Sequence, residues 1–267
     1  MSTPHFTPDI TDDLVRTHEQ YLVPAIYSQW ASRVADIAEI EVGQEVLDVA
    51  CGTGSLARAA QLETGLKGKV VGLDLSEKML AAARRHSQLI EWRLGDAALM
   101  PFDDNRFDRV MCQFSFMFIS NRVATIKEML RVCKPDGLVI LAIWGPLQPA
   151  SAYDDLIKMM RQVSGEPAAR KLATPWDLGK PGVMDSLLIS SGVNEYECHE
   201  RVGLARYESL QAFLEAHLRL ADEYDSLDNA AFEKILETAN IKLHSHLSAH
   251  RQLLTQLNAR IFKISPD

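Results

Sequence analysis

A carboxylate near the end of an apolar run, followed at once by a glycine-containing turn, is the first group in this chain that could do chemistry. The run Glu45–Val49 has the pattern of a strand and contains Asp48. Gly52 and Gly54 follow in the turn, where they allow backbone angles and close approaches that a side chain would forbid. An alanine-rich helical pattern begins directly after them, so the stretch has the order of the ligand-binding end of an α/β unit. A phosphate at the helix N-terminus would be repelled by Asp48, so the carboxylate favours a ligand that presents positive charge.

Three further polar side chains stand at the ends of other predicted strands. Apolar runs end at Asp74, just before Asp96, and at Gln113. Because the carboxyl ends of parallel strands meet at one edge of a sheet, we expect these groups and Asp48 to surround a single cofactor. S-adenosylmethionine (SAM) carries an α-ammonium and a sulfonium, and therefore matches the positive charge that Asp48 favours.

The elements that must position these groups alternate between strand and helix patterns from residue 45 to residue 144. This alternation predicts an α/β fold with a doubly wound, mostly parallel sheet. Two helices, one at 11–22 and one that begins at Pro24, precede the first strand and cap the sheet. Strands at 193–202 and 257–264 are expected to pair antiparallel, with helices between them. The chain then divides into cap helices at 1–40, a cofactor-binding core at 41–205 and 251–267, and a helical insertion at 206–250. We expect this insertion to form a lid over the acceptor, the substrate that would receive a group from the cofactor.

The composition is that of an ordinary globular protein with an excess of acidic residues. The 267 residues carry a net charge of −8, and 47% of them are hydrophobic. An acidic chain lacks the basic face that nucleic acids and anionic membranes require, and no apolar run approaches the ~20 residues of a membrane span. Met1–Asp12 has no signal-peptide pattern, and the four cysteines have no paired spacing. We therefore expect a cytoplasmic protein that binds a small molecule rather than nucleic acid or membrane, with its oligomeric state open and a homodimer included.

Five short motifs occur in a fixed order along the first half of the chain. They are Val46–Gly54, Gly72–Ser76 with Met79 and Leu80, Gly95–Ala97 with Leu99–Phe102, Phe107 and Asp108 with Cys112 and Gln113, and Lys134–Gly137. Together they resemble class I SAM-dependent methyltransferases, in particular the branch related to the C-methyltransferases of ubiquinone and menaquinone biosynthesis. The resemblance covers about residues 20–145 and implies a Rossmann-like fold with seven strands, the last of them antiparallel. Ala50 stands where the family usually has its first glycine, and Asp136 where it usually has another.

The resemblance implies which residues hold the methionine end of SAM. Asp48 and the backbone of Ala50–Gly54 surround it, and the Gln113 region offers a backbone carbonyl to the α-ammonium. Tyr21, in the cap helices, closes over the same end. The residue pattern leaves an alternative for Asp48, which either contacts the cofactor or only orients the glycine turn.

The resemblance also implies which residues hold the adenosine end. Asp74 accepts both ribose hydroxyls, for which the paired oxygens of a carboxylate are suited. Leu75 and Met79 enclose the adenine, although Met79 fits plain helix core equally well. Asp96 accepts the adenine amino group, and the backbone of Ala97 lies near a ring nitrogen.

No residue is marked as a general base, so the catalytic residues are unassigned and no metal site is expected. His217 lies on the apolar face of a helical pattern, which is typical of a hydrogen-bonded core histidine, and His18 lies in the cap helices, from which it could face the site. His246 and His250 have a spacing that metal ligands use, but no carboxylate motif accompanies them. The aromatic residues of 113–118 either line an acceptor pocket or pack beneath the cap helices.

The leading hypothesis is transfer of the SAM methyl group to a small, partly apolar metabolite, as in secondary metabolism, with an oxygen, nitrogen or carbon acceptor. Such a transfer is an in-line displacement, for which proximity and orientation supply most of the catalysis. The alternative is a SAM-binding protein that transfers no methyl group and uses the cofactor structurally or in a pericyclic reaction. A third hypothesis, an NAD-dependent oxidoreductase, is disfavoured by Asp48 and by Ala57, which occupies the position of a third glycine.

Overall fold

The centre of the fold is a twisted sheet whose strands follow the predicted alternation. The structure is a computed structural model that describes residues 10–221 and 229–266, and within these residues it contains a seven-stranded sheet in the order β3-β2-β1-β4-β5-β7-β6. Strands β1 to β5 pair in parallel, and β7 runs antiparallel to both of its neighbours, which confirms the predicted sheet. The strands are β1 (Glu45–Val49), β2 (Lys69–Asp74), β3 (Glu91–Leu94), β4 (Phe107–Gln113), β5 (Cys133–Trp144), β6 (Glu197–Tyr207) and β7 (Leu253–Ile264).

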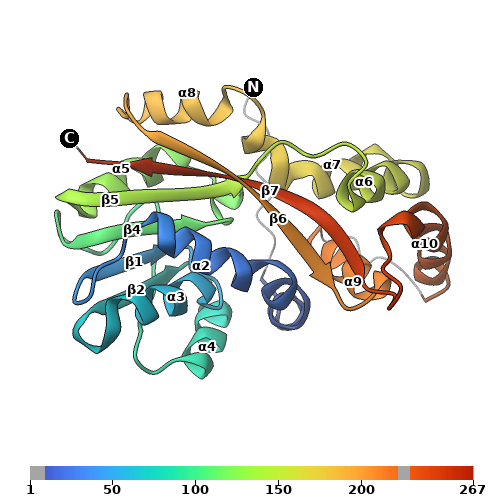
Figure 1. Cartoon of the computed structure of the whole chain (residues 1–267), viewed down its shortest axis with the longest axis horizontal. Coiled ribbons are helices and arrows are strands. Elements are labelled where there is room, and N and C mark those ends of the chain that lie inside the picture. Colours follow the sequence, from blue (N-terminus) through green and yellow to red (C-terminus); the bar gives the residue numbers. More distant parts are fainter. Residues whose placement is uncertain (1–9, 222–228, 267) are drawn as a thin grey trace.

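Helices cover both faces of this sheet and form a separate group at one end (Figure 1). Those that belong to the strand–helix alternation are α3 (Ser55–Thr64), α4 (Glu77–His86), α5 (Arg122–Val132) and α8 (Val183–Ser190). Those of the end group are α6 (Ala152–Val163), α7 (Glu166–Ala173), α9 (Leu210–Leu220) and α10 (Asn229–Lys242). The predicted division of the chain at 1–40 and 206–250 includes residues 1–9 and 222–228, which lie outside the described residues.

The predicted break before Pro24 is wrong, because the N-terminal helix continues through this proline. Helix α1 (Asp12–Thr17) runs into a π-helical stretch, η1 (His18–Tyr27), and then into α2 (Ser28–Ile37). In η1 each turn is wider than in an α-helix, as shown by the Ser28 N–H, which donates to the carbonyl of Val23 five residues earlier. The wider turns accommodate the proline ring, which would clash with a carbonyl in an ordinary α-helix.

Strands β6 and β7 extend well beyond the rest of the sheet as a two-stranded ribbon (Figure 1). Their pairing runs from Glu197 opposite Lys263 to Tyr207 opposite Leu253, whereas β5 pairs only with the part of β7 from Ala259 onward. Helices α9 and α10 lie between these strands in the sequence, as predicted for the insertion. Helices α6 and α7 join them in the end group.

A buried polar network fixes the end group of helices to the ribbon. The hydroxyl of Tyr207 lies 2.8 Å from Nε2 of His217 and 3.3 Å from the hydroxyl of Tyr153. Burial lowers the pKa of His217 to about 3, so the ring is neutral. His217 is therefore the hydrogen-bonded core histidine that the apolar helix face predicted.

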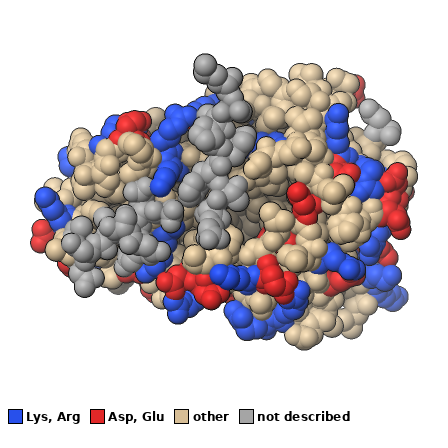
Figure 2. Space-filling model, turned by 180° about the vertical axis from the view of Figure 1, so that it is seen from behind, with Lys and Arg blue, Asp and Glu red and all other residues tan. Residues whose placement is uncertain are grey.

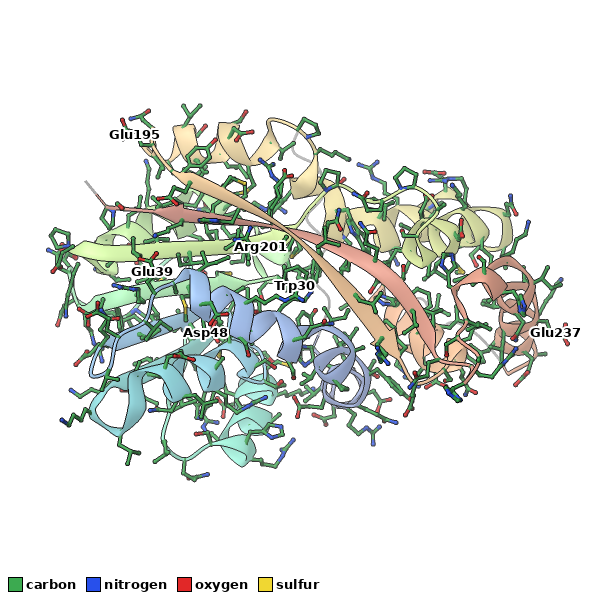
Figure 3. The ribbon with its side chains drawn as sticks, in the orientation of Figure 1. Trp30, Glu39, Asp48, Glu195, Arg201 and Glu237 are labelled. Atoms are coloured by element: carbon green, nitrogen blue, oxygen red, sulfur yellow. The ribbon has the colours of Figure 1, made fainter. Side chains whose placement is uncertain are left out.

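Trp30 fixes the N-terminal helix to the sheet. It is fully buried between the N-terminal helix and the sheet (Figure 3). Its ring lies edge-on to Phe114 and Trp144, which stack on each other with ring centroids 3.5 Å apart. A Cβ on Gly203 of β6 would lie only 2.4 Å from Cζ2 of Trp30. The absence of a side chain at Gly203 therefore sets how closely α2 approaches β6, and with it where η1 lies.

We expect Gly203→Ala to lower the free energy of unfolding by about 1–3 kcal/mol, the usual cost of overpacking. The measurement is urea-induced unfolding of the substituted and wild-type proteins. In a Trp30→Phe background, where the ring is smaller, the same alanine should cost clearly less. An equal cost in both backgrounds would show that the contact with Trp30 is not its source.

Candidate cofactor and acceptor site

A cavity of about 710 Å³ opens at the edge where β1, β2, β3 and β4 end. This size is within the range of about 300–1,000 Å³ that is usual for small-molecule sites. Nine of the eleven predicted cofactor residues line it, and their role as cofactor ligands stays a prediction. The nine are Asp48, Ala50, Gly52, Asp74, Leu75, Met79, Asp96, Ala97 and Gln113.

Two carboxylates, buried Asp48 and half-buried Asp74, lie at the centre of this edge. Oδ2 of Asp48 accepts the N–H of Ala57 at 2.9 Å, and the Asp48 side chain is almost fully buried. The carboxylate of Asp74 accepts the N–H of Gly52 and that of Ser76, both at 2.8 Å. Asp48 thus orients the start of α3 and also lines the cavity, so both of the roles considered for it are compatible with the structure.

The pKa values of these carboxyl groups lie above their ordinary range. Burial raises the pKa of Asp48 to about 8, and the charge of Asp74 contributes to the rise against the hydrogen bond from Ala57. Burial also raises the pKa of Asp74, against the hydrogen bonds from Ser76, Gly52 and Leu75. A positive charge in the cavity would restore the ionised forms, because an opposite charge favours ionisation.

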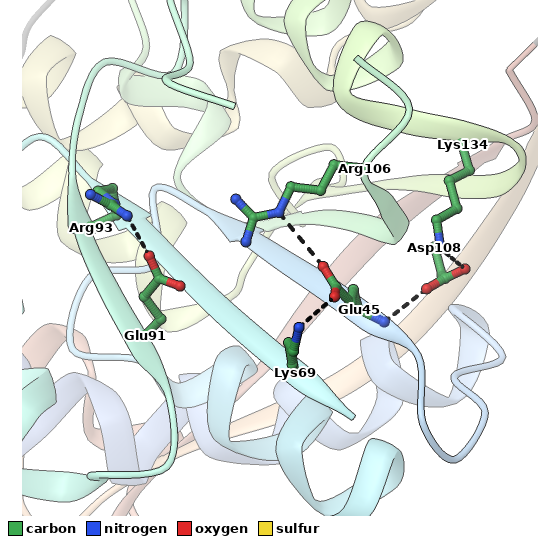
Figure 4. Close-up of polar contacts among 7 residues, drawn as sticks. All are labelled: Glu45, Lys69, Glu91, Arg93, Arg106, Asp108 and Lys134. Atoms are coloured by element: carbon green, nitrogen blue, oxygen red, sulfur yellow. Dashed lines mark hydrogen bonds and ion pairs between the residues drawn. The ribbon is translucent and has the colours of Figure 1, made fainter. Parts of the chain in front are cut away.

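At the opposite edge of the sheet the acidic groups have basic partners (Figure 4). Glu45 pairs with Lys69 and Arg106, and Asp108 pairs with Lys134 at 2.8 Å. Burial tends to raise the pKa of Asp108, but the hydrogen bonds from Lys134 and the Glu45 N–H hold it below its usual value. Glu45 and Asp108 therefore have salt bridges to basic side chains, whereas Asp48 and Asp74 at the cavity have none among the described residues.

The adenosine side of the cavity is more open than the region around Asp48. Leu75 is 69% exposed, and Asp96 is exposed and accepts the N–H of Ala98 at 2.8 Å. Met79 is buried against Val15 of α1, so it is both helix core and cavity wall.

Two predicted residues, Tyr21 and Gly54, do not line the cavity. The hydroxyl of Tyr21 donates to Glu215 of α9 at 3.0 Å, and its closure over the methionyl end stays a prediction. Gly54 has a φ of +84°, and a Cβ on it would lie 2.2 Å from Cη2 of Trp92. The absence of a Cβ there is explained by packing against this indole.

His18 and Tyr27 of η1 enter the cavity, although neither was assigned to the cofactor from the sequence. Their rings stack with centroids 5.0 Å apart, and Nδ1 of His18 lies 3.3 Å from Oγ1 of Thr53. Burial lowers the pKa of His18 to about 4, with Glu19 opposing the change and Arg58 adding to it. The position of His18 among the cap helices was the only sequence signal for this placement.

An apolar wall completes the cavity beside Tyr27. It is formed by Leu14, Leu22, Phe114, Phe118, Ile119 and Leu220, which come from the N-terminal helix, the segment after β4 and the end of α9. Of the aromatic residues after β4, Phe114 and Phe118 line the cavity, whereas Phe116 packs in the core. Phe114 therefore both lines the cavity and packs against Trp30 of the cap helices, and an acceptor pocket at this segment stays a prediction.

Comparison with known proteins identifies the central part of the chain. Residues 47–141 match a family model described as a methyltransferase domain. This part of the chain is therefore similar to a methyltransferase domain. This match confirms the resemblance inferred from the motifs. A demethylmenaquinone methyltransferase of Staphylococcus epidermidis is 38% identical over 114 residues, which are 42% of this chain and 47% of the relative.

Solved structures share the fold of the methyltransferase domain at low sequence identity. The YcgJ protein of Bacillus subtilis covers 90% of this chain and 99% of its own, with a TM-score of 0.56 and 15% identity. Phosphoethanolamine N-methyltransferase 2 of Haemonchus contortus, in complex with phosphomonomethylethanolamine and S-adenosylhomocysteine, is 19% identical with a TM-score of 0.59 and covers 96% of this chain and 58% of its own. This chain spans about half the length of the curated relatives it matches.

The methyltransferase domain supplies only one side of the cavity. Its matched residues include Asp48, Asp74, Asp96 and Gln113, but the N-terminal helix and α9 lie outside the match. Within residues 10–221 and 229–266, none of the helices has the length and apolar character needed to cross a membrane. The same residues contain no group of three potential metal ligands, and His246 pairs with Asp155.

We expect Asp48→Asn to stabilise the protein at neutral pH. Folding raises the pKa of Asp48 from 3.8 to about 8, so between these values the folded state loses stability as the pH rises. Asparagine keeps an oxygen for the Ala57 N–H and cannot ionise. The gain in the free energy of unfolding at pH 7 should be at least ~1.4 kcal/mol, the equivalent of one pKa unit, and it should vanish toward pH 4 in urea titrations.

Asp108→Asn is the matched control for this prediction, because the pKa of Asp108 is lowered by folding. A carboxyl group of this kind stabilises the protein above its unfolded pKa, so the substitution should destabilise it at neutral pH, with a difference that closes in acid. If both substitutions changed stability in the same direction, the pKa of Asp48 would not be raised.

Proposed function

We propose that the protein binds SAM and transfers its methyl group to a small, partly apolar acceptor. The observation that carries this proposal is the pair of carboxylates, buried Asp48 and half-buried Asp74, which have backbone donors but no salt bridge to a basic side chain among the described residues. A ligand with positive charge compensates such a site, whereas a pyrophosphate would be repelled.

The residues of the cavity fit SAM in the type and placement of their polar groups. Asp48 would face the positive methionine end. Asp74 would accept the ribose hydroxyls with the lone pairs that Gly52 and Ser76 leave free, and Asp96 would accept from the adenine amino group. Leu75 and Met79 would enclose the adenine from the α4 side.

When bound, SAM supplies an electrophilic methyl group on a sulfonium. The chain's own contribution is to align an acceptor with that group and to exclude water, and orientation of this kind supplies ~7–11 kcal/mol. The apolar wall excludes water on the acceptor side. Tyr21 of η1 and Glu215 of α9 hold the two covering elements together by their hydrogen bond.

The acceptor is expected to be apolar over much of its surface and to carry no strong negative charge. Lys78 is the only lysine or arginine among the described residues that line the cavity, and it is exposed. A phosphate-bearing acceptor, such as the one bound by the Haemonchus enzyme, would lack a cationic partner there. An acceptor of the kind named for the curated relatives, demethylmenaquinone, fits the apolar wall better.

A large nucleic acid is a poor candidate for the acceptor. On the face drawn in Figure 2, lysine and arginine side chains alternate with acidic ones rather than forming one basic surface. The net charge of −8 agrees with this distribution. Protein–nucleic acid affinity depends mainly on basic contacts to phosphates, which this face does not concentrate.

We expect Asp74→Asn to weaken SAM binding roughly tenfold or more, because hydrogen bonds to a charged group are worth ~1.5–3 kcal/mol. The measurement is isothermal titration with SAM. Asp136→Asn removes an exposed carboxylate at the start of β5, outside the cavity, and should bind as the wild type does. Equal binding by the wild type and the Asp74 variant would contradict the proposed site.

Methyl transfer itself is tested by incubating the protein with SAM and a panel of phenols, quinols and amines. Release of S-adenosylhomocysteine in proportion to a methylated product is expected. Tight SAM binding together with acceptor conversion that leaves SAM unconsumed would instead support the alternative, a SAM-binding protein that transfers no methyl group.

A further inference from the structure

In the proposed function, the carboxylates of the cavity bind the positively charged groups of SAM. They do not explain how the negatively charged α-carboxylate of SAM is bound. The described lining residues include four carboxylates, those of Asp48, Asp74, Glu77 and Asp96. The α-ammonium and the α-carboxylate of SAM are attached to one carbon, so a cofactor whose ammonium meets Asp48 has its carboxylate close by. That carboxylate needs hydrogen-bond donors, because an unpaired charge in a buried site is costly.

His18 is placed to be such a donor. Its ring lies over the glycine turn, since a Cβ on Gly52 would be 3.9 Å from both Cε1 and Nε2 of His18. The turn belongs to the same strand–helix connection that Asp48 anchors through Ala57. His18 therefore faces the methionine end of the site from the N-terminal helix, across from the carboxylates of the sheet.

The tautomer of His18 follows from its buried neighbour. Thr53 is fully buried, and among the described residues its hydroxyl has only Nδ1 of His18 as a partner. A buried hydroxyl that does not donate loses a hydrogen bond, so the Thr53 hydroxyl donates to Nδ1. The ring hydrogen is then on Nε2, which has no partner among the described residues, and the His18 side chain lines the cavity.

Two charged side chains act on His18 in opposite senses. Arg58 donates to the carbonyl of Thr53 at 2.8 Å, and its positive charge acts on His18. Glu19 has the larger effect and raises the pKa of His18, and one of its carboxylate oxygens is paired with His86 of α4. Ser55, the first residue of α3, also lines the cavity, and its hydroxyl has no hydrogen-bond partner among the described residues.

We propose that His18, assisted by Ser55, binds the α-carboxylate of SAM. The proposal rests on the proposed function and assigns His18 to the cofactor rather than to the acceptor. Tyr27 holds the imidazole in place by stacking on its ring, and Thr53 does so by its hydrogen bond to Nδ1.

The test compares SAM with decarboxylated SAM, which lacks only the carboxylate, by isothermal titration. His18→Phe keeps an aromatic ring for the stack on Tyr27 and removes the donor. It should weaken SAM binding about 10- to 100-fold, as expected for a lost hydrogen bond to a charged group, and leave the binding of decarboxylated SAM unchanged. His18→Gln, whose amide can donate, should retain most of the affinity for SAM.

The outcomes separate this inference from the proposed function. If the wild type binds neither compound, the proposed function fails. If the wild type binds SAM and His18→Phe weakens both compounds equally, or weakens neither and only slows methyl transfer, the carboxylate assignment is overturned. Should His18→Phe fail to fold, Ser55→Ala serves in its place, with a smaller loss, of a fewfold, that is again confined to SAM.

Discussion

The burial of the Asp48 carboxylate is the constraint on which the rest of the site depends. Its neighbours offer it one backbone donor, from Ala57, and place a second carboxylate, Asp74, beside it. Burying two ionised carboxylates beside each other is costly, so the pKa of Asp48 rises, and a cationic ligand would favour the ionised forms. Strand order produces the arrangement, because β1 lies between β2 and β4 at the centre of the sheet, where the connections diverge and ligands bind.

The cavity combines two parts of the chain that have different physical tasks. The methyltransferase domain contributes the carboxylates and the glycine turn, and the N-terminal helix and α9 contribute the apolar wall with His18 and Tyr27. The second part has its place only because Trp30 packs against Gly203 and the long β6–β7 ribbon carries α9 toward η1. The proposed cofactor ligands thus lie at one sheet edge, whereas the proposed acceptor side depends on contacts between distant segments.

This division explains what the sequence could predict. Strand periodicity and the polar residues at strand ends predicted the sheet, its antiparallel last strand and the convergence of Asp48, Asp74 and Asp96, because all of these follow from local pattern and parallel topology. The place of His18 could not be predicted, since it depends on how a helix packs over the turn. The π-helical turns around Pro24 also change which face of η1 meets the cavity, so an assumption of ordinary helical spacing misleads there.

The substitution of alanine for the family's first glycine shows how rigid the turn is. Ala50 has a φ of +54°, a left-handed conformation that costs a non-glycine residue ~1–2 kcal/mol. Such strain persists only where neighbouring contacts over-determine the backbone. Here the Ser115 hydroxyl donates to the carbonyl of Ala50 at 2.9 Å, and the Cys51 N–H donates to the carbonyl of Leu73 at 3.0 Å. Strand β2 and the segment after β4 therefore hold the turn in shape, and the proposed cofactor site is formed by the fold rather than by its ligand.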